Sequence, residues 1–314
     1  MRGEVNKLKF LVARNIKLYF KDKLTFFVSL ITPLILVFLF LTFLRQVYET
    51  SLIECLPEGF TLSDRLVNAF TGGWLFSSIM TTSCITVSFC SNLLVNDKIN
   101  KVYNDFQIAP IKKSTVQISY AISNFITTFI VCFVVLVLSM IYLAIVGWYL
   151  SFLDLVLILV NMILLIMFGT LLATIIGFFI SSQGAQSAVC TLVSSMYGFI
   201  CGAYMPIASF GNGMKYFVSF IPGTYSTVLF RQFYFGGVLE EMKKTIPEQA
   251  VEGIKDGFDG NFYFFDNQVP SWAMFLIIIC SCVVLFGILT LIIHLKNKKK
   301  KEKHISVETV SETK

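Results

Sequence analysis

The sequence predicts an all-α integral membrane protein with six transmembrane helices. Hydrophobic residues make up 56% of its 314 residues and charged residues only 14%, against about 25% charged in an ordinary soluble domain. A hydrocarbon core of about 30 Å requires about 20 helical residues to cross it. The apolar runs are Leu24–Leu44, Gly73–Val95, Val116–Trp148, Leu155–Ile180, Ala188–Met205 and Trp272–Leu295, and all but the fifth reach that length. The function must therefore be performed in or across a membrane.

The distribution of positive charge predicts the topology. Most of the 25 Lys and Arg residues lie before the first run, between the second and third, or after the last. The positive-inside rule then places both termini in the cytoplasm. An even number of spans agrees with this, because it requires both ends of the chain to lie on one side of the membrane. Residues 296–314 form a basic cytoplasmic tail. We interpret its lysines as an anchor to anionic membrane lipid and not as a nucleic-acid site, because they follow a span directly.

Residues 1–23 predict an amphipathic helix at the inner membrane interface. Apolar and basic residues fall on opposite faces at helical spacing. The apolar stripe is Val5, Leu8, Val12, Ile16 and Tyr19, and the basic face is Lys7, Arg14, Lys17 and Lys21. A simple cytosolic anchor that satisfies the positive-inside rule is the alternative interpretation.

The first span contains Pro33, which should kink it or end a first short segment. An acidic outer loop, Arg45–Asn68, follows. The second span is rich in hydroxyl groups, among them Thr81, Thr82 and Thr86. Such groups can bond back to helix carbonyls at a packed interface, or they can line a wet path. Both interpretations remain open from the sequence.

The loop Asn96–Pro110 predicts one short amphipathic helix of about three turns. Ile99, Val102, Tyr103 and Phe106 follow the helical spacing, and Pro110 disfavours helix just before it. Ser114-x-x-Gln117 then has the pattern of a capping box for the third span. A helix built into such a loop suggests a surface that contacts another protein. The alternative is a helix that rests flat on the membrane.

The segment after the fifth span predicts a re-entrant helical hairpin. Gly198 and Gly202 form a small-xxx-small pattern that permits close helix approach. The chain from Pro206 to Phe235 is apolar but broken at Pro206, at residues 211–213 and at Pro222, so each piece was expected to be too short to span. Irregular backbone at membrane depth must be shielded by protein or water, which favours a hairpin entering from outside. Residues 236–270 are acidic and predict an external cap.

The chain lacks the residues of an enzyme or a self-powered pump. It has no phosphate-binding loop, no Gly-x-Ser-x-Gly elbow and no His-Glu-x-x-His motif. With two His residues in all, a His-based metal or triad site is nearly excluded. The predicted spans hold essentially no charged residue of the kind that ion-coupled carriers use. The energy must then come from a partner.

The order of these elements resembles the type-2 permeases of ATP-binding-cassette (ABC) exporters, close to the drug-resistance and antibiotic-export permeases. The resemblance covers residues 24–295 as one permease domain, together with the helix before it. It rests on the entry helix ending in Asn15-Ile16-Lys17-Leu18-Tyr19-Phe20-Lys21-Asp22, the Pro33-containing first span, and Ile108-Ala109-Pro110-Ile111-Lys112-Lys113. Tyr204-Met205-Pro206-Ile207 and Leu229-Phe230-Arg231-Gln232 complete it.

The resemblance implies a permease at the cell membrane that pairs with a second permease and docks on a separate ATPase subunit, which binds ATP and Mg²⁺. No cofactor is expected in this chain. The implied ATPase-coupling residues are Asp97, Lys98, Lys101, Val102, Tyr103, Asp105 and Phe106. The implied path and gate residues are Thr81, Thr82, Thr86, Gly198, Gly202, Met205, Pro206 and Pro222. The uncharged path favours an amphipathic or hydrophobic cargo such as a drug, lipid or peptide. The alternative is a non-transporting membrane scaffold or sensor partner.

Overall fold

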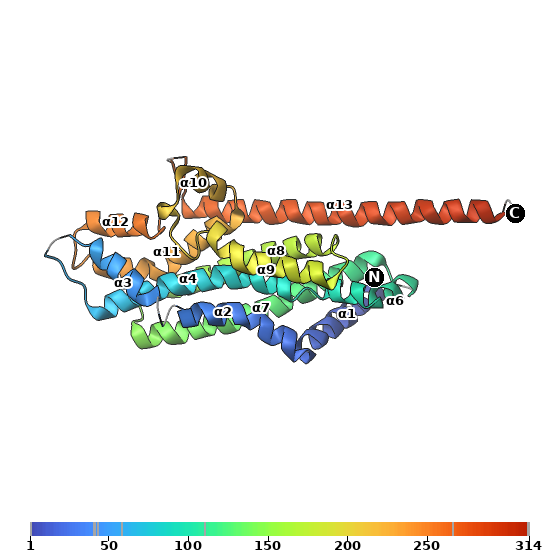
Figure 1. The fold of residues 1–314 in the computed structure, drawn as a ribbon, viewed down its shortest axis with the longest axis horizontal. Coiled ribbons are helices and arrows are strands. Elements are labelled where there is room, and N and C mark those ends of the chain that lie inside the picture. Colours follow the sequence, from blue (N-terminus) through green and yellow to red (C-terminus); the bar gives the residue numbers. More distant parts are fainter. Residues whose placement is uncertain are drawn as a thin grey trace.

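Helix α4 (Asp64–Cys90) runs through the centre of a helical bundle in the computed structural model (Figure 1). The structure describes residues 2–39, 42, 44–57, 59–109, 111–265 and 267–312, with side chains described up to residue 295. Almost every residue of α4 is buried, because five other helices pack against it. They are α2 (Lys23–Leu39), α7 (Lys113–Val146), α8 (Phe152–Gly177), α9 (Gln183–Ile200) and α11 (Pro222–Met242). A Cβ at Gly73 would lie 3.0 Å from the carbonyl oxygen of Tyr234, so this glycine allows α11 to approach closely.

Four segments of the described chain are long and apolar enough to cross a membrane. They are Asp64–Ile99, Lys113–Val146, Phe152–Gly177 and Ser271–Leu295, which correspond to the predicted second, third, fourth and sixth spans. The second and third of these are helices α7 and α8, and the last belongs to α13 (Ser271–Glu312). The protein is therefore a multi-pass, all-helical membrane protein.

The predicted first and fifth spans correspond to shorter or less apolar helices. Helix α2 covers Lys23–Leu39, and residues 40, 41 and 43 of the predicted span lie outside the described chain. It continues through Pro33 and does not end there. Helix α9 covers Gln183–Ile200 and begins at an N-cap provided by Ser182. The count of six spans therefore stays a prediction.

Helix α1 (Arg2–Lys21) confirms the predicted N-terminal helix, but its buried face differs from the predicted stripe. Leu11, Asn15 and Tyr19 are the buried residues, while Val5 is half exposed. The reason is that α1 packs along α7, and the Asn15 amide donates to Ser123 Oγ of α7 at 3.3 Å. Packing against protein therefore decides which side of this helix is covered.

The acidic outer loop is largely helical. Helix α3 (Arg45–Glu54) buries Tyr48 and Leu52 against the bundle. Helix α4 then begins at Asp64, nine residues before the predicted start of the second span, because the Ser63 side chain caps its first turn by accepting from the Leu66 N–H.

The predicted single helix at 96–110 is wrong, since two short helices occupy that region. Helix α5 covers Leu93–Ile99 and helix α6 covers Val102–Ile108. Lys101 separates them in a left-handed conformation with φ of 62°, which interrupts the helical hydrogen bonds. Pro110 lies outside the described residues.

The predicted capping box at Ser114 is also wrong. Helix α7 begins one residue earlier, with Lys112 at the N-cap and no side-chain cap. A capping box is found instead at α8, where Ser151 and Asp154 exchange hydrogen bonds with each other's backbone N–H.

The broken region after α9 contains one long helix. A short 3₁₀ turn (Ile207–Ser209) and α10 (Asn212–Ser219) precede α11 (Pro222–Met242). The 21 residues of α11 extend about 31 Å, which is longer than the pieces expected here, but α11 is not among the four segments of the described chain that are long and apolar enough to cross a membrane. Pro222 occupies the first turn, where its fixed φ starts a helix without loss of a hydrogen bond. The re-entrant entry from outside stays a prediction.

The acidic cap begins after Met242, because α11 continues through the first residues assigned to it. It consists of α12 (Glu248–Gly257) and a small antiparallel hairpin of β1 (Tyr263–Phe264) and β2 (Asn267–Gln268). Asp266 lies outside the described residues. Helices α3 and α12 lie at one end of the molecule, while α6 and both chain termini lie toward the other (Figure 1). The segments predicted to be outside and inside are thus at opposite ends.

Candidate coupling surface and translocation cavity

The predicted anchors of the ATPase contact face partly into the permease itself. Val102, Tyr103 and Phe106 are half-buried, and the Tyr103 hydroxyl accepts from the Gln117 amide of α7 at 3.3 Å. The Phe106 ring lies under the Arg14 guanidinium, 5.2 Å from its centroid. These three residues therefore hold α6 against α1 and α7, and only part of each side chain remains for a partner.

The side chains of Asp97 and Arg14 point into the molecule. From the sequence, Asp97 was expected at the ATPase contact and Arg14 on the basic face of α1. Asp97 is 7% exposed and accepts hydrogen bonds from the Tyr120 hydroxyl and from Arg14 Nη1, the latter at 2.6 Å. Burial lowers the pKa of Arg14, but the hydrogen bond and charge of Asp97 outweigh that effect and leave the pKa raised. Arg14 was placed on the solvent face of α1, and this placement is wrong because a buried carboxylate attracts it.

Lys98, Lys101 and Asp105 lie around the two short helices. The Lys98 ammonium donates to the Gly177 carbonyl at the end of α8, at 2.6 Å. Lys101 and Asp105 are exposed. Lys98 therefore fixes α5 to α8, while the other two lie on the open face of α6.

The sequence reasoning missed the most exposed apolar residue of this surface. Ile108 is 87% exposed, at the end of α6. Exposed residues at helical spacing form the open face of α6: Lys101, Asn104, Asp105 and Ile108. The available signal was that this isoleucine lies off the buried stripe of the helix.

An apolar cavity of about 730 Å³ lies between α2, α3, α4 and α9. Its lining residues are Ile31, Ile35, Leu36, Leu39, Leu44, Tyr48, Trp74, Leu75, Ser78, Ile79, Cys90, Cys190, Thr191, Ser194, Ser195, Phe199, Ala203 and Tyr204. The Ser78 and Ser195 hydroxyls donate back to carbonyls of their own helices. With these polar groups satisfied, the wall suits an apolar ligand of drug or lipid-tail size.

The three predicted path residues on α4 are not among the residues that line this cavity. Thr81 and Thr82 are buried and donate to the carbonyls of Ser77 and Ser78, at 3.0 and 2.9 Å. Thr86 is buried too, and its hydroxyl has no hydrogen-bond partner among the described residues. This placement fits the packing interpretation of the hydroxyl-rich span, and the path role of these three residues stays a prediction.

The two glycines of the predicted helix contact fold the chain back on itself. A Cβ at Gly198 would lie 2.2 Å from the Tyr204 ring. Gly202 lies beyond the end of α9, with φ of 72°, and a Cβ there would lie 2.4 Å from Ile207 Cγ1. Both residues therefore allow a tight corner after α9, and their role in the approach of a second helix stays a prediction.

The remaining predicted gate residues mark the bends around α10. Met205 is 37% exposed, Pro206 is the N-cap of the 3₁₀ turn, and Pro222 starts α11. Each proline thus lies directly at the start of a helical element, as its missing N–H favours.

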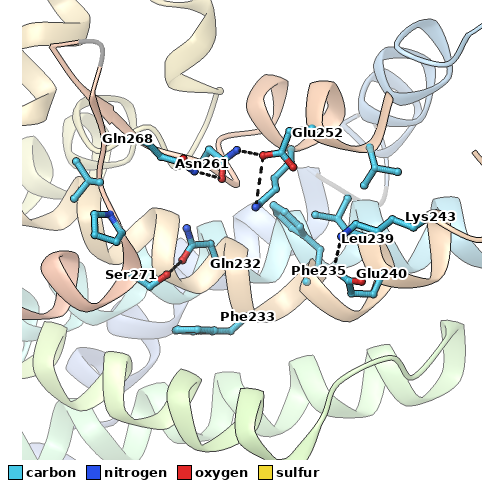
Figure 2. Close-up of a pocket in the computed structure, with 15 residues that line it drawn as sticks. Gln232, Phe233, Phe235, Leu239, Glu240, Lys243, Glu252, Asn261, Gln268 and Ser271 are labelled. Atoms are coloured by element: carbon cyan, nitrogen blue, oxygen red, sulfur yellow. Dashed lines mark hydrogen bonds and ion pairs between the residues drawn. The ribbon is translucent and has the colours of Figure 1, made fainter. Parts of the chain in front are cut away.

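A smaller pocket of about 320 Å³ lies between α11, α12 and the segment that leads into α13 (Figure 2). Its polar groups bind one another. The Gln268 amide donates to Asn261 Oδ1 at 3.0 Å, and the Asn261 amide donates to Glu252 Oε1 at 2.6 Å. Among the described residues no group of three or more His, Cys, Asp or Glu could hold a metal ion, and the eight cysteines are unpaired.

Comparison with known proteins identifies the family of the chain. A family model described as ABC-2 type transporter matches residues 6–235. No curated protein and no solved structure matched. The match covers most of the chain, including the entry helix, the two short coupling-surface helices and the cavity-lining helices. The matched residues form a multi-pass membrane permease domain, which is not itself an ATPase, and the chain belongs to the ABC-2 type transporter family.

Proposed function

We propose that this chain is the permease subunit of an ABC exporter that moves an amphipathic or hydrophobic cargo, such as a drug, lipid or peptide, out of the cell. The observation that carries the proposal is the apolar cavity of about 730 Å³ between α2, α3, α4 and α9. Its wall offers neither a charged side chain nor many free hydrogen-bond groups, so a cargo of low polarity binds there at least cost.

Energy for transport comes from a separate ATPase subunit, which binds ATP and Mg²⁺. ABC-2 permeases generally pair with such a subunit. The open face of α6, with Ile108 flanked by Lys101 and Asp105, is the surface on which it docks. An exposed isoleucine surrounded by charged residues has the composition of an interface centre with a polar rim.

A second permease, identical or related, completes the transporter. Beside the residues that line the cavity, α2 and α9 also expose apolar side chains, with Leu34 54% exposed and Met196 51% exposed. The cavity is bounded by only one side of each helix, so a second copy facing it would close the path on its open side. We assign the location to the cell membrane.

The proposed topology places both termini in the cytoplasm and the acidic cap outside. Cysteine labelling of a Glu252→Cys variant in intact cells tests it, because Glu252 is exposed on α12. Labelling that requires opening of the membrane would contradict the topology.

The function itself is tested first by asking whether a neighbouring reading frame encodes an ATPase with a phosphate loop, and then by co-expressing that ATPase with this chain. The purified complex is then screened for compounds that stimulate ATP turnover. We expect stimulation by lipophilic compounds and none by small charged metabolites. A chain that binds no ATPase, or whose complex responds to no compound, is better explained as a membrane scaffold or sensor partner.

A further inference from the structure

Arg231 of α11 is completely buried. Its Nη1 donates to Asp259 Oδ2 at 2.5 Å, and its Nη2 donates to the Gly202 carbonyl at 2.6 Å. The guanidinium also lies 4.8 Å from the centroid of the Trp74 ring on α4. A buried charge is tolerated only when it is paired and hydrogen-bonded, so these contacts must form together.

Asp259 belongs to the acidic cap and reaches back into the bundle. Its carboxylate also accepts from the backbone N–H groups of Ile207 and Ala208, at 2.6 and 3.1 Å. Its backbone is in the left-handed region, with φ of 55°, where non-glycine residues are uncommon. The end of α12 holds this conformation, because the Gly260 N–H donates to the Lys255 carbonyl at 2.6 Å and the Asp259 N–H donates to the Asp256 carbonyl at 3.3 Å, as in a Schellman cap.

Gln232 and Gly260, which follow Arg231 and Asp259 in the chain, make a second connection between α11 and the cap. The Gln232 amide donates to the Gly260 carbonyl at 2.8 Å. Ser271 Oγ at the start of α13 donates to Gln232 Oε1 at 2.8 Å, as Figure 2 shows. Two consecutive residues of α11 therefore hold two consecutive residues of the cap, and α13 is joined to the same point.

The element held between Arg231 and Asp259 is the corner 201–208 after α9. Arg231 binds the carbonyl at its beginning, and Asp259 binds the N–H groups at its end. Ala203 and Tyr204 of this corner line the apolar cavity, and the Tyr204 carbonyl accepts from the Tyr48 hydroxyl at 3.0 Å. The cavity wall at the cap end is thus held at both ends of the corner by this ion pair, in addition to the bonds that Ala203 and Tyr204 make to α9 and α3.

We propose that Asp259 and Arg231 are positioning residues for transport, and that their ion pair keeps the corner 201–208 in place so that the cap end of the cavity stays closed. The acidic cap, in this proposal, supplies the carboxylate that holds the closed position. The inference rests on the proposed export role and extends it, because it assigns closure to a contact between the cap and α11.

The test measures the reactivity of Cys201, a buried thiol at the corner itself, in the full chain in intact cells. A membrane-impermeant maleimide is added, and modification is read by mass spectrometry. Cys55 of the outer loop is exposed and serves as the internal reference. The main variant is Asp259→Asn, which keeps the shape and tolerates the left-handed backbone. The matched control is Asp256→Asn, because Asp256 accepts only from Asn261 and Tyr263 within the cap.

We expect Asp259→Asn to raise the Cys201 labelling rate relative to Cys55 by about tenfold or more, since it weakens a charge-assisted hydrogen bond. Asp256→Asn should leave the rate unchanged. Equal Cys201 rates in wild type and Asp259→Asn would overturn the proposal. If Asp259→Asn does not accumulate, the same measurement on Arg231→Lys, which keeps the charge but cannot make both bonds in the same geometry, decides by the same criterion.

The labelling measurement needs neither ATP nor cargo, so its result is independent of the export assay. Cys55 labelling only in opened membranes would contradict the proposed topology. Normal Cys55 labelling with unchanged Cys201 labelling would contradict the role of the ion pair alone.

Discussion

Replacing Ile108 by alanine should weaken the binding of the ATPase subunit while leaving the permease folded. Ile108 is 87% exposed, so nearly its whole side chain is available to a partner. Alanine removes three carbons, and each buried carbon contributes about 0.8 kcal/mol, which gives a loss of about 2 kcal/mol on docking. That loss corresponds to about a thirtyfold increase in the dissociation constant of the ATPase.

The assay titrates labelled ATPase onto purified permease in lipid nanodiscs and measures the dissociation constant. Ile145→Ala is the matched control, because Ile145 is 80% exposed but lies at the far end of α7, away from α6. Both variants should unfold at the wild-type temperature, since neither side chain packs against the protein. Dissociation constants within twofold of wild type for Ile108→Ala would refute the assignment of the open face of α6 as the docking surface.

Further predictions concern the packing of α11, and both are read by thermal unfolding in detergent. A Cβ at Gly237 would lie 1.9 Å from the Tyr149 carbonyl oxygen, so Gly237→Ala should cost about 1–3 kcal/mol. Gly236→Ala meets no atom within 4 Å and should be neutral or slightly stabilising, and equal effects of the two would contradict this packing. The Ser226 hydroxyl donates to Asn161 Oδ1 at 3.0 Å across α8 and α11. Ser226→Ala should cost about 1 kcal/mol alone and much less when Asn161 is already alanine, whereas additive losses would exclude a direct interaction.

The long apolar helices could be predicted from the sequence because hydropathy and length act locally. The third span was expected at Val116–Trp148 and is found at Lys113–Val146. The central helix α4 was expected to begin at Gly73 and begins at Asp64. Gly72 and Gly73 were expected to mark the start of this helix. They instead lie inside it and allow neighbouring helices to approach, and those helices come from residues far away in the chain.

The features that could not be predicted from the sequence depend on contacts between residues that lie far apart in the chain. Helix α11 carries Arg231, and the burial of this charge could not be predicted because the carboxylate that pairs with it belongs to Asp259, 28 residues later. Asp97 was expected to contact the ATPase, but its carboxylate instead accepts a hydrogen bond from Arg14, 83 positions before it, and points into the molecule. Hydroxyl groups on α4 fit both packing and path lining until the surrounding helices are known.

Uptake into inside-out membrane vesicles tests the central claim most directly. The vesicles contain the permease with its ATPase, and the cargo is the lipophilic compound that most stimulates ATP turnover. We expect uptake that requires MgATP and that Ser194→Trp abolishes, since Ser194 lines the apolar cavity and a tryptophan would fill it, while the ATPase stays bound. MgATP-dependent uptake at the wild-type rate in Ser194→Trp would contradict a path through this cavity, and the absence of any MgATP-dependent uptake in wild type would contradict export itself.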